Sequence, residues 1–445
     1  MLQISLQMLW KERKKALNLG ITITITLCVC IIFLQFFNNP IINYLVNILK
    51  DTTKFYGYEA ITEYEVMRFY DGMYKGTMVI ILLVIFISLI MYSCNYYNKT
   101  NSRIVGLLKI MGCRDREILF FQMIQLIVIT LISYLIAVGI SFLLIPLCQA
   151  LAYLYMGVSE NIFYYALETY VDSLPLVLLL LVFMTFMQIS YSIRGVIPDL
   201  LKNDEIVSFK KRRRITIVAN VNYIVLFIIG TFTIYISDLN QGLIFPAGLY
   251  VIGAYNLGVM CFPNLLEKWI KLKNIDAKES LIFNNFILNL QQMKSVILMF
   301  VLSSAILLTM MCTNLDDLQY TILFQLGYVL TNIVLSFTLI NRFRINQINK
   351  KQYYRNLSRL GLNYEEIRYM TKKEKTLMYE MIAVLSLVYL SNLNIAFVYR
   401  DKMGVLSALF LILELIIPLF ISYRVAVYQE EMRIRDRKST RLNSS

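Results

Sequence analysis

Long apolar stretches dominate the hydrophobic pattern of the chain, and short polar segments separate them. A helix needs about 20 predominantly apolar residues to cross a bilayer. Ten stretches are of about this length, which predicts an all-α polytopic membrane protein with ten transmembrane helices. The predicted spans are 17–37, 77–97, 118–148, 173–193, 217–237, 244–262, 295–313, 320–341, 376–399 and 403–423. The third stretch is too long for a simple span, so we expect it to tilt or to project beyond the membrane.

Composition agrees with this pattern. Of the 445 residues, 58% are hydrophobic and only 16% are charged. Soluble globular proteins carry about 25% charged residues, and disordered chains carry few apolar ones. The chain has no His, which excludes Ser-His-Asp catalysis and His-based metal sites. Its seven Cys form no C-x-x-C pair and fall mostly in apolar runs. We therefore predict neither a metal nor a cofactor.

The distribution of Lys and Arg predicts the orientation. With the N-terminus inside, the outer loops contain only six of the 43 basic residues, as the positive-inside rule requires. These six are Lys50, Lys54, Arg68, Lys75, Arg400 and Lys402. The sequence thus predicts a multi-pass protein of the bacterial plasma membrane, with both termini in the cytoplasm.

Several segments lie outside the predicted spans. Residues 1–16 form an amphipathic pattern suited to the inner membrane interface. The basic run 210–214 precedes a span, which favours contact with membrane lipid over nucleic acid. The remaining segments are a small outer cap at 38–76, a basic cytoplasmic linker at 195–216, a cytoplasmic amphipathic segment at 263–294 and a non-native tail at 436–445 that reads like a translated sequencing adapter.

Two basic loops resemble each other and suggest an internal duplication. The loop from Arg103 and the loop from Gln352 align without a gap, pairing Leu108 with Leu357, Met111 with Leu360, Gly112 with Gly361, and Glu117 with Glu366. Chance similarity of basic loops is the alternative. A duplication predicts four-helix repeats at 17–194 and 295–424, with connecting helices five and six at 217–262. A displacement of six spans leaves both copies in the same orientation, related by an axis along the membrane normal.

The first loop has the pattern of a helix, a turn and a second helix. Gly112 is suited to end a helix in the left-handed conformation, and Asp115 and Glu117 suit the first turn of the next one. Arg103, Gly106 and Lys109 share a polar, partly small face, opposite an apolar face. Such a helix can dock into the groove of a partner. An amphipathic loop anchored to lipid headgroups is the alternative.

The pattern Arg103-x-x-Gly106-Leu-Leu-Lys-x-Met-Gly112-x-x-x-x-Glu-Ile118 resembles the signature loop of FtsX-like permease domains, the membrane subunits of mechanotransmitting ABC systems. Two such domains in a ten-span chain resemble the bacitracin-export type of permease. The resemblance implies that the loops 98–117 and 342–375 are coupling helices seated on ATPase subunits. The implied coupling residues are Arg103, Gly106, Leu108, Lys109, Met111, Gly112, Arg116, Glu117, Leu357, Leu360, Gly361, Glu365 and Glu366.

The chain departs from that family in two ways. Its second loop has Ser358 where a basic residue is usual, and it has no Gly opposite Gly106. The loop between spans seven and eight, at 314–319, is too short for the large extracellular domain of the bacitracin type. Peptide capture by such a domain is therefore in doubt, whereas coupling to an ATPase is unaffected.

The chain has no G-x-x-x-x-G-K-[S/T] motif, so ATP would be bound by a separate subunit. We therefore expect a non-enzymatic permease subunit that works with a cytoplasmic ABC ATPase, two copies per chain, and moves or releases an amphiphile such as an antimicrobial peptide or a lipid-linked compound at the outer leaflet. A membrane sensor kinase is a further candidate partner.

Glu414 is the predicted intramembrane polar residue. An ionisable group at that depth is costly and must face protein or water. It could serve a substrate or proton path, or it could form a structural hydrogen bond to a polar side chain such as Gln125, Gln188 or Asn332. The rival functions are accordingly a secondary transporter that uses Glu414 and a non-transporting regulatory membrane scaffold.

Overall fold

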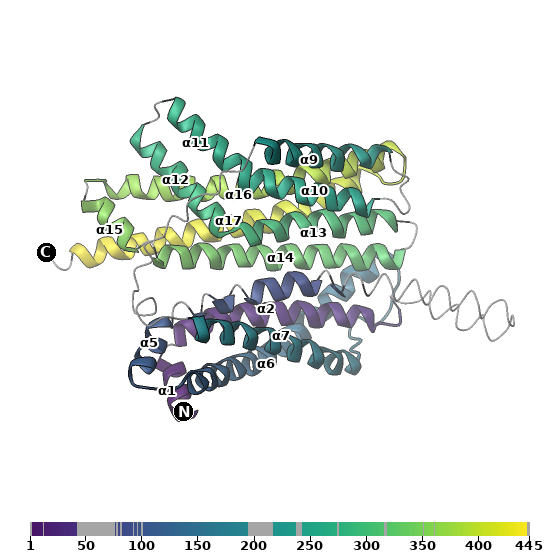
Figure 1. Ribbon diagram of the computed structural model, residues 1–445. Coiled ribbons are helices and arrows are strands. Elements are labelled where there is room, and N and C mark those ends of the chain that lie inside the picture. The colour runs from purple at the N-terminus through teal and green to yellow at the C-terminus, as the bar shows by residue number, and fades with distance from the viewer. Residues whose placement is uncertain are drawn as a thin grey trace. The chain divides into compact units, whose positions relative to one another are not determined.

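The computed structural model describes residues 2–11, 13–41, 76, 79–80, 82–91, 93–95, 97–98, 101–194, 217–236, 243–273, 276–315, 318–349, 351–359 and 361–442. The regular elements in these ranges are all helices (Figure 1). The chain divides into two compact units, Met1–Ser208 and Phe209–Ser445. The predicted all-α fold is therefore confirmed. Most of the predicted outer cap 38–76 and all of the linker 195–216 lie outside the described residues, as do the side chains of the tail 436–445.

The first unit is a set of helices packed around α2 and α6. Its elements are α1 (Leu2–Lys11), α2 (Arg13–Phe37), α5 (Ser102–Ile110), α6 (Asp115–Met156) and α7 (Leu167–Arg194), with helical residues also described between 82 and 98. Helix α6 packs along α2 and α7, and α1 packs against it as well. At 42 residues, α6 is about 63 Å long. It exceeds a hydrocarbon core of about 30 Å, as expected for the over-long third stretch.

The described helices of the second unit run from residue 217 to residue 442. They are α9 (Ile217–Ile236), α10 (Ile244–Asn256), the π-helical turn η1 (Leu257–Cys261), α11 (Phe262–Leu272), α12 (Ala277–Gln292), α13 (Lys294–Thr313), α14 (Leu318–Asn349), α15 (Lys351–Arg359), α16 (Tyr364–Tyr399) and α17 (Val405–Leu442). Helix α13 packs against α10, α14 and α16. Tyr250 of α10 and Tyr389 of α16 are fully buried, with ring centroids 4.6 Å apart.

Helices α9 and α10 approach each other closely through glycines. A Cβ atom at Gly230 would lie 2.5 Å from the backbone nitrogen of Tyr250, and one at Gly253 would lie 2.5 Å from that of Phe227. A side chain at either position would force the helices apart. Small residues permit such contacts between membrane helices, where packing takes the place of a hydrophobic driving force.

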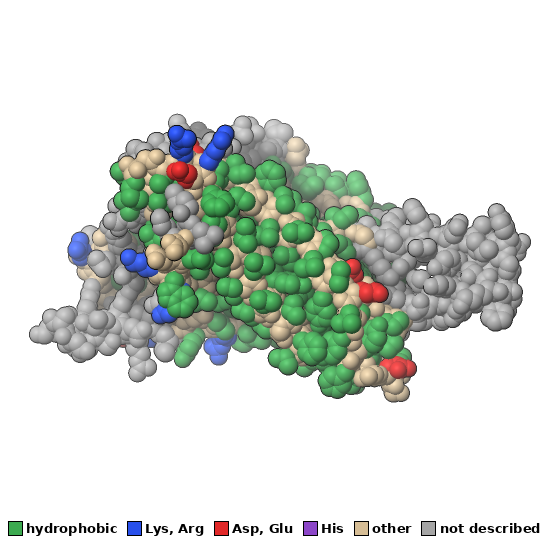
Figure 2. Space-filling view, turned by 90° about the horizontal axis from the view of Figure 1, so that it is seen from below, with side chains coloured by type: hydrophobic (Ala, Val, Ile, Leu, Met, Phe, Trp, Pro, Cys, Tyr) green, Lys and Arg blue, Asp and Glu red, His purple; other side chains and the backbone are tan. Residues whose placement is uncertain are grey.

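The apolar helices indicate a multi-pass membrane protein. Within the described ranges, eight helices are long and apolar enough to cross a bilayer, and the shorter apolar helices Leu82–Asn95 and Val221–Ile236 coincide with the second and fifth predicted spans. Figure 2 shows apolar side chains over the middle of one face, with the visible Lys and Arg gathered toward one end. The count of ten spans stays a prediction.

Candidate functional site

A rigid turn joins α5 to α6 in the first unit. Gly112 has a φ of 85°, a backbone conformation that residues with a Cβ adopt only with strain. Its N–H donates to the carbonyl of Lys109 at 3.1 Å, and the N–H of Cys113 donates to that of Leu108 at 3.1 Å. These two bonds close the end of α5 in a Schellman arrangement. The role predicted for Gly112 as the end of this helix is confirmed.

Three charged side chains fix the start of α6. The N–H of Arg114 donates to Oε2 of Glu117 at 3.0 Å, which satisfies a donor left free at a helix N-terminus. Lys109 Nζ lies 3.1 Å from Oδ1 of Asp115, across the turn. Lys109 and Glu117, both predicted coupling residues, therefore stabilise the turn itself. Arg116 is exposed.

The inner side of α5 packs on α6. Val105 and Leu108 form a buried cluster with Ile118 and Phe121, and Met8 of α1 packs against this cluster. Gly106 is buried too. Leu108 is only 6% exposed, so it holds α5 in place and cannot form the surface that a partner would touch. Of Arg103 the structure describes the position in the first turn of α5 but not the side chain.

The outer side of α5 is apolar and exposed. Leu107, Ile110 and Met111 are 48%, 56% and 70% exposed. We refer to these three residues as the α5 apolar face. Met111 belongs to the predicted coupling residues, and the other two form the apolar side of the predicted docking helix. This face is an apolar surface of the first turn that can contact another molecule.

The second unit has a turn of the same geometry between α15 and α16. Gly361 has a φ of 94°, and the N–H of Leu362 donates to the carbonyl of Leu357 at 3.3 Å. The N–H of Asn363 donates to Oε2 of Glu366 at 2.9 Å. Leu357 is buried, as Leu108 is. Glu365 is exposed, and Leu360 lies outside the described residues.

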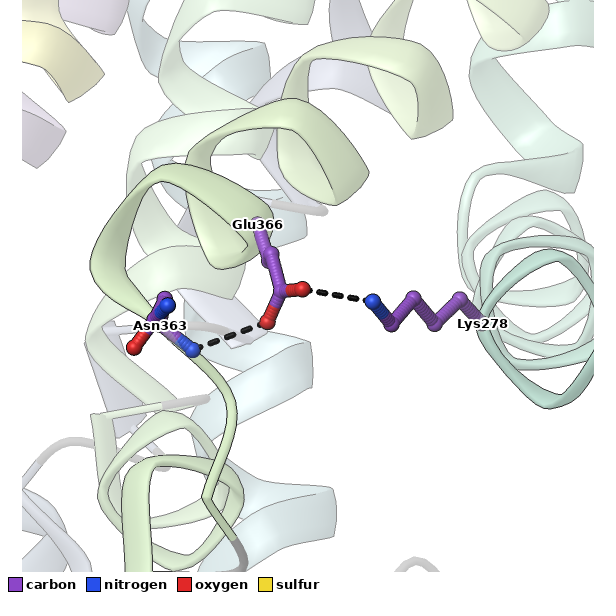
Figure 3. Close-up of polar contacts among 3 residues, drawn as sticks. All are labelled: Lys278, Asn363 and Glu366. Carbon is purple, nitrogen blue, oxygen red and sulfur yellow. Dashed lines mark hydrogen bonds and ion pairs between the residues drawn. The ribbon is translucent and has the colours of Figure 1, made fainter.

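Helix α12 braces this second turn. Lys278 Nζ donates to Oε1 of Glu366 at 2.5 Å, while the other oxygen of that carboxylate caps α16 through Asn363 (Figure 3). About two turns further along α16, Lys373 Nζ donates to Oε1 of Glu279 at 3.0 Å. The charges are exchanged between the two pairs, since α12 supplies a Lys to one and a Glu to the other.

Buried polar contacts extend the brace. Asn289 donates to the buried carboxylate of Glu374, and Asn285 Nδ2 donates to the hydroxyl of Tyr353 on α15 at 3.2 Å. Burial raises the pKa of Tyr353 above its ordinary value, although the bond from Asn285 opposes the shift. Tyr353 is therefore neutral at physiological pH. The sequence predicts an amphipathic segment at 263–294, but the partners of this segment on α15 and α16 depend on the fold and could not be predicted.

Glu414 on α17 has an amide partner, although not one of those named from the sequence. Gln325 Nε2 of α14 donates to its Oε1 at 2.7 Å. Gln125 and Gln188 belong to the first unit, where they bond to Tyr97 and Asn98. Asn332 lies about two turns beyond Gln325 on α14. The contact supports the structural interpretation of Glu414, with Gln325 as the corrected partner.

Within the described ranges, no three His, Cys, Asp or Glu side chains lie close enough together to hold a metal ion. The arrangement offers two rigid helix–turn–helix elements and an exposed apolar face.

Comparison with known families identifies the first of these elements. Residues 76–197 match the family model described as FtsX-like permease C-terminal. The matched segment contains α5, the Gly112 turn, α6 and α7. The resemblance of this segment to FtsX-like permeases, seen in the sequence, is thereby confirmed. No curated protein matches the chain.

Proposed function

We propose that the chain is the membrane permease subunit of an ABC transporter, in which a separate cytoplasmic ATPase hydrolyses ATP. The observation that carries this proposal is the α5 apolar face. It lies at a turn within the segment that matches the FtsX-like permease family. Three neighbouring apolar side chains exposed beside a polar turn favour a protein contact, because burying them against a partner is favourable.

The first turn is suited to transmit force. The left-handed glycine, the Glu117 cap, the Lys109–Asp115 pair and the buried cluster hold α5 on the end of α6. A push on α5 would therefore move α6 as one body, because a packed helix shifts as a unit and does not bend smoothly. Since α6 is 42 residues long, the displacement would reach the opposite side of the membrane.

The second turn supports a stoichiometry of two ATPase copies per chain. Its glycine, its cap and its buried leucine repeat those of the first turn. Each turn would seat on one ATPase, so that closure of an ATPase dimer moves both. The like orientation of the two halves and the cytoplasmic placement of both termini belong to this proposal.

The proposed cargo is an amphiphile in or at the outer leaflet, such as an antimicrobial peptide or a lipid-linked compound. Apart from the predicted outer cap at 38–76, the outer loops that follow α6 and α13 are short, at 157–166 and 314–317, so a cargo bound at those loops would be met close to the bilayer. A sensor kinase partner would likewise contact the helices themselves.

The test replaces the α5 apolar face. The variant Leu107→Ala, Ile110→Ala and Met111→Ala removes exposed side chains only, so folding should be preserved. Its control is Leu147→Ala, Leu151→Ala and Leu154→Ala, three exposed residues near the far end of α6. The chain is co-expressed with a candidate cytoplasmic ABC ATPase from the same organism, and co-purification and ATP hydrolysis are measured. We expect the α5 variant to lose about tenfold or more in binding and stimulation, and the control to lose neither. Equal behaviour of the two variants would remove the basis of the coupling role.

A further inference from the structure

Helix α11 has an apolar face that stays largely exposed within the second unit. Leu265, Trp269 and Leu272 follow one another at helical spacing and are 63%, 46% and 86% exposed. The opposite side of the helix carries the buried Pro263. We call Leu265, Trp269 and Leu272 the α11 outer face. An exposed apolar patch of this kind marks a site of interaction.

Lysines flank the α11 outer face. On the helical wheel Lys268 and Lys271 lie to one side of it, and Lys273 lies to the other. Lys273 Nζ is 5.1 Å from the centroid of the Trp269 ring, within the range of a cation–π contact. A helix with Trp and Leu on one face and Lys beside it is typical of binding in the headgroup region of an anionic membrane.

The position of α11 along the chain agrees with a membrane surface. It continues without a break from α10 through η1, as part of the 29-residue apolar helix Ile244–Leu272. About 20 residues suffice to cross the hydrocarbon core, so the residues after about Pro263 reach the interface, where Trp is enriched. Figure 1 shows α11 leaning away from the direction of α10, with α12 returning toward the other helices of the unit.

We propose that the α11 outer face lies in the headgroup region of the anionic lipid leaflet into which α10 leads. The three flanking lysines and the direct continuation of a membrane span favour lipid over a soluble protein as the occupant. The proposal concerns lipid binding by this chain alone and does not depend on an ATPase partner.

Lipid bound to α11 would also position the second turn. The Trp269 ring meets that of Phe283 on α12 edge-on at 6.0 Å, and Phe262 meets Phe286 at 6.3 Å. On the same helix, Lys278 pairs with Glu366. The α11–α12 hairpin thus joins the lipid surface to the cap of α16 through contacts within one unit.

The experiment uses the two tryptophans of the chain. Trp10→Phe leaves Trp269 as the sole Trp of the full-length protein. This protein is reconstituted in mixed phosphatidylglycerol and phosphatidylcholine bilayers, with bromine on the acyl chains of one lipid or the other. Quenching of Trp269 then gives the relative association of the two lipids. We expect quenching by both, with the anionic lipid favoured at least about tenfold because each of the three lysines is attracted to the anionic surface.

Substitution of the lysines and added salt test whether charge causes the preference for the anionic lipid. The triple variant Lys268→Gln, Lys271→Gln and Lys273→Gln should bring the ratio of phosphatidylglycerol to phosphatidylcholine association close to one. The control variant Lys372→Gln, at an exposed position of α16, should leave this ratio unchanged. Added salt should reduce the preference in the unmodified helix as well. Absence of quenching by either lipid, or a preference that ignores both the lysines and salt, would overturn the proposal. Shielding of Trp269 from aqueous acrylamide only after the ABC ATPase is added would overturn it too, by assigning the face to a protein.

Discussion

Gln125 and Glu374 each lie thirteen residues after a left-handed glycine, and each is hydrogen-bonded to the helix that precedes its predicted four-helix repeat. Gln125 Nε2 of α6 donates to the carbonyl of Ser5 in α1 at 3.3 Å. Glu374 of α16 accepts from Asn289 in α12. Both side chains are buried.

The correspondence supports the proposed duplication, because these contacts lie outside the two loops that resemble each other. The two attachments also differ in their chemistry. The attachment of α1 is neutral, with Ser5 Oγ also donating to the carbonyl of Phe121 at 2.9 Å. The attachment of α12 includes two partly exposed ion pairs. We therefore expect the brace of the second turn, but not the α1 attachment of the first, to respond to ionic strength.

The turn glycines give the first prediction. Gly112→Ala and Gly361→Ala should each lower the free energy of unfolding by about 1–2 kcal/mol, because a Cβ disfavours the left-handed conformation. Gly139 is the matched control. It lies inside α6, and nothing lies within 4 Å of the position that a Cβ would take there, so Gly139→Ala should be neutral or slightly stabilising. Thermal unfolding in detergent would distinguish the positions, and an equal effect at all three would contradict the assigned turn geometry.

The Lys278–Glu366 pair gives a second prediction. Lys278→Glu should destabilise the second unit by about 0.5–1 kcal/mol. Glu366→Lys should cost more, because it also removes the acceptor for the N–H of Asn363. The exchanged pair should recover only the ion-pair part of the loss. High salt should reduce the difference in a thermal unfolding measurement. Lys372→Glu, at an exposed position of α16, serves as the control. A double variant as unstable as the sum of its singles would show that the two side chains do not interact.

The contact between α9 and α10 gives a third prediction. Gly253→Ala would place a Cβ 2.5 Å from the backbone of Phe227, so the helices would have to separate at a cost of about 1–3 kcal/mol. Gly248 lies in the same helix, and an added methyl group there would meet nothing within 4 Å. We expect Gly248→Ala to be tolerated in the same unfolding measurement. Equal tolerance at Gly253 would mean that the helices are further apart.

Glu414 gives a fourth prediction, which separates the structural interpretation from a transport path. Glu414→Gln keeps an oxygen that can accept from Gln325, so stability and ATP-driven function should remain near those of the unmodified chain. Glu414→Ala removes the acceptor and should cost about 1 kcal/mol of stability. If Glu414→Gln left the protein stable yet abolished transport, the carboxylate itself would be required, as a secondary transporter would demand.

Local features of the site could be predicted from the sequence because they depend on near neighbours. The glycine that ends α5, the acidic first turn of α6 and the apolar runs all follow from local conformational preference and periodicity. Contacts between distant segments could not be predicted. The resemblance implies a coupling role for Leu108, which packs inward, and the sequence does not identify Gln325 as the partner of Glu414. Both depend on which helix faces meet, and a single sequence does not state this.

The central claim is that an ATPase seats on the α5 apolar face. The direct measurement is site-specific photo-cross-linking from position 111, with position 154 at the far end of α6 as the control, in the full chain co-expressed with a candidate ABC ATPase from the same organism. We predict a cross-link to the ATPase from position 111 and none from position 154. A cross-link from neither position, or from position 111 to lipid alone, would contradict the account.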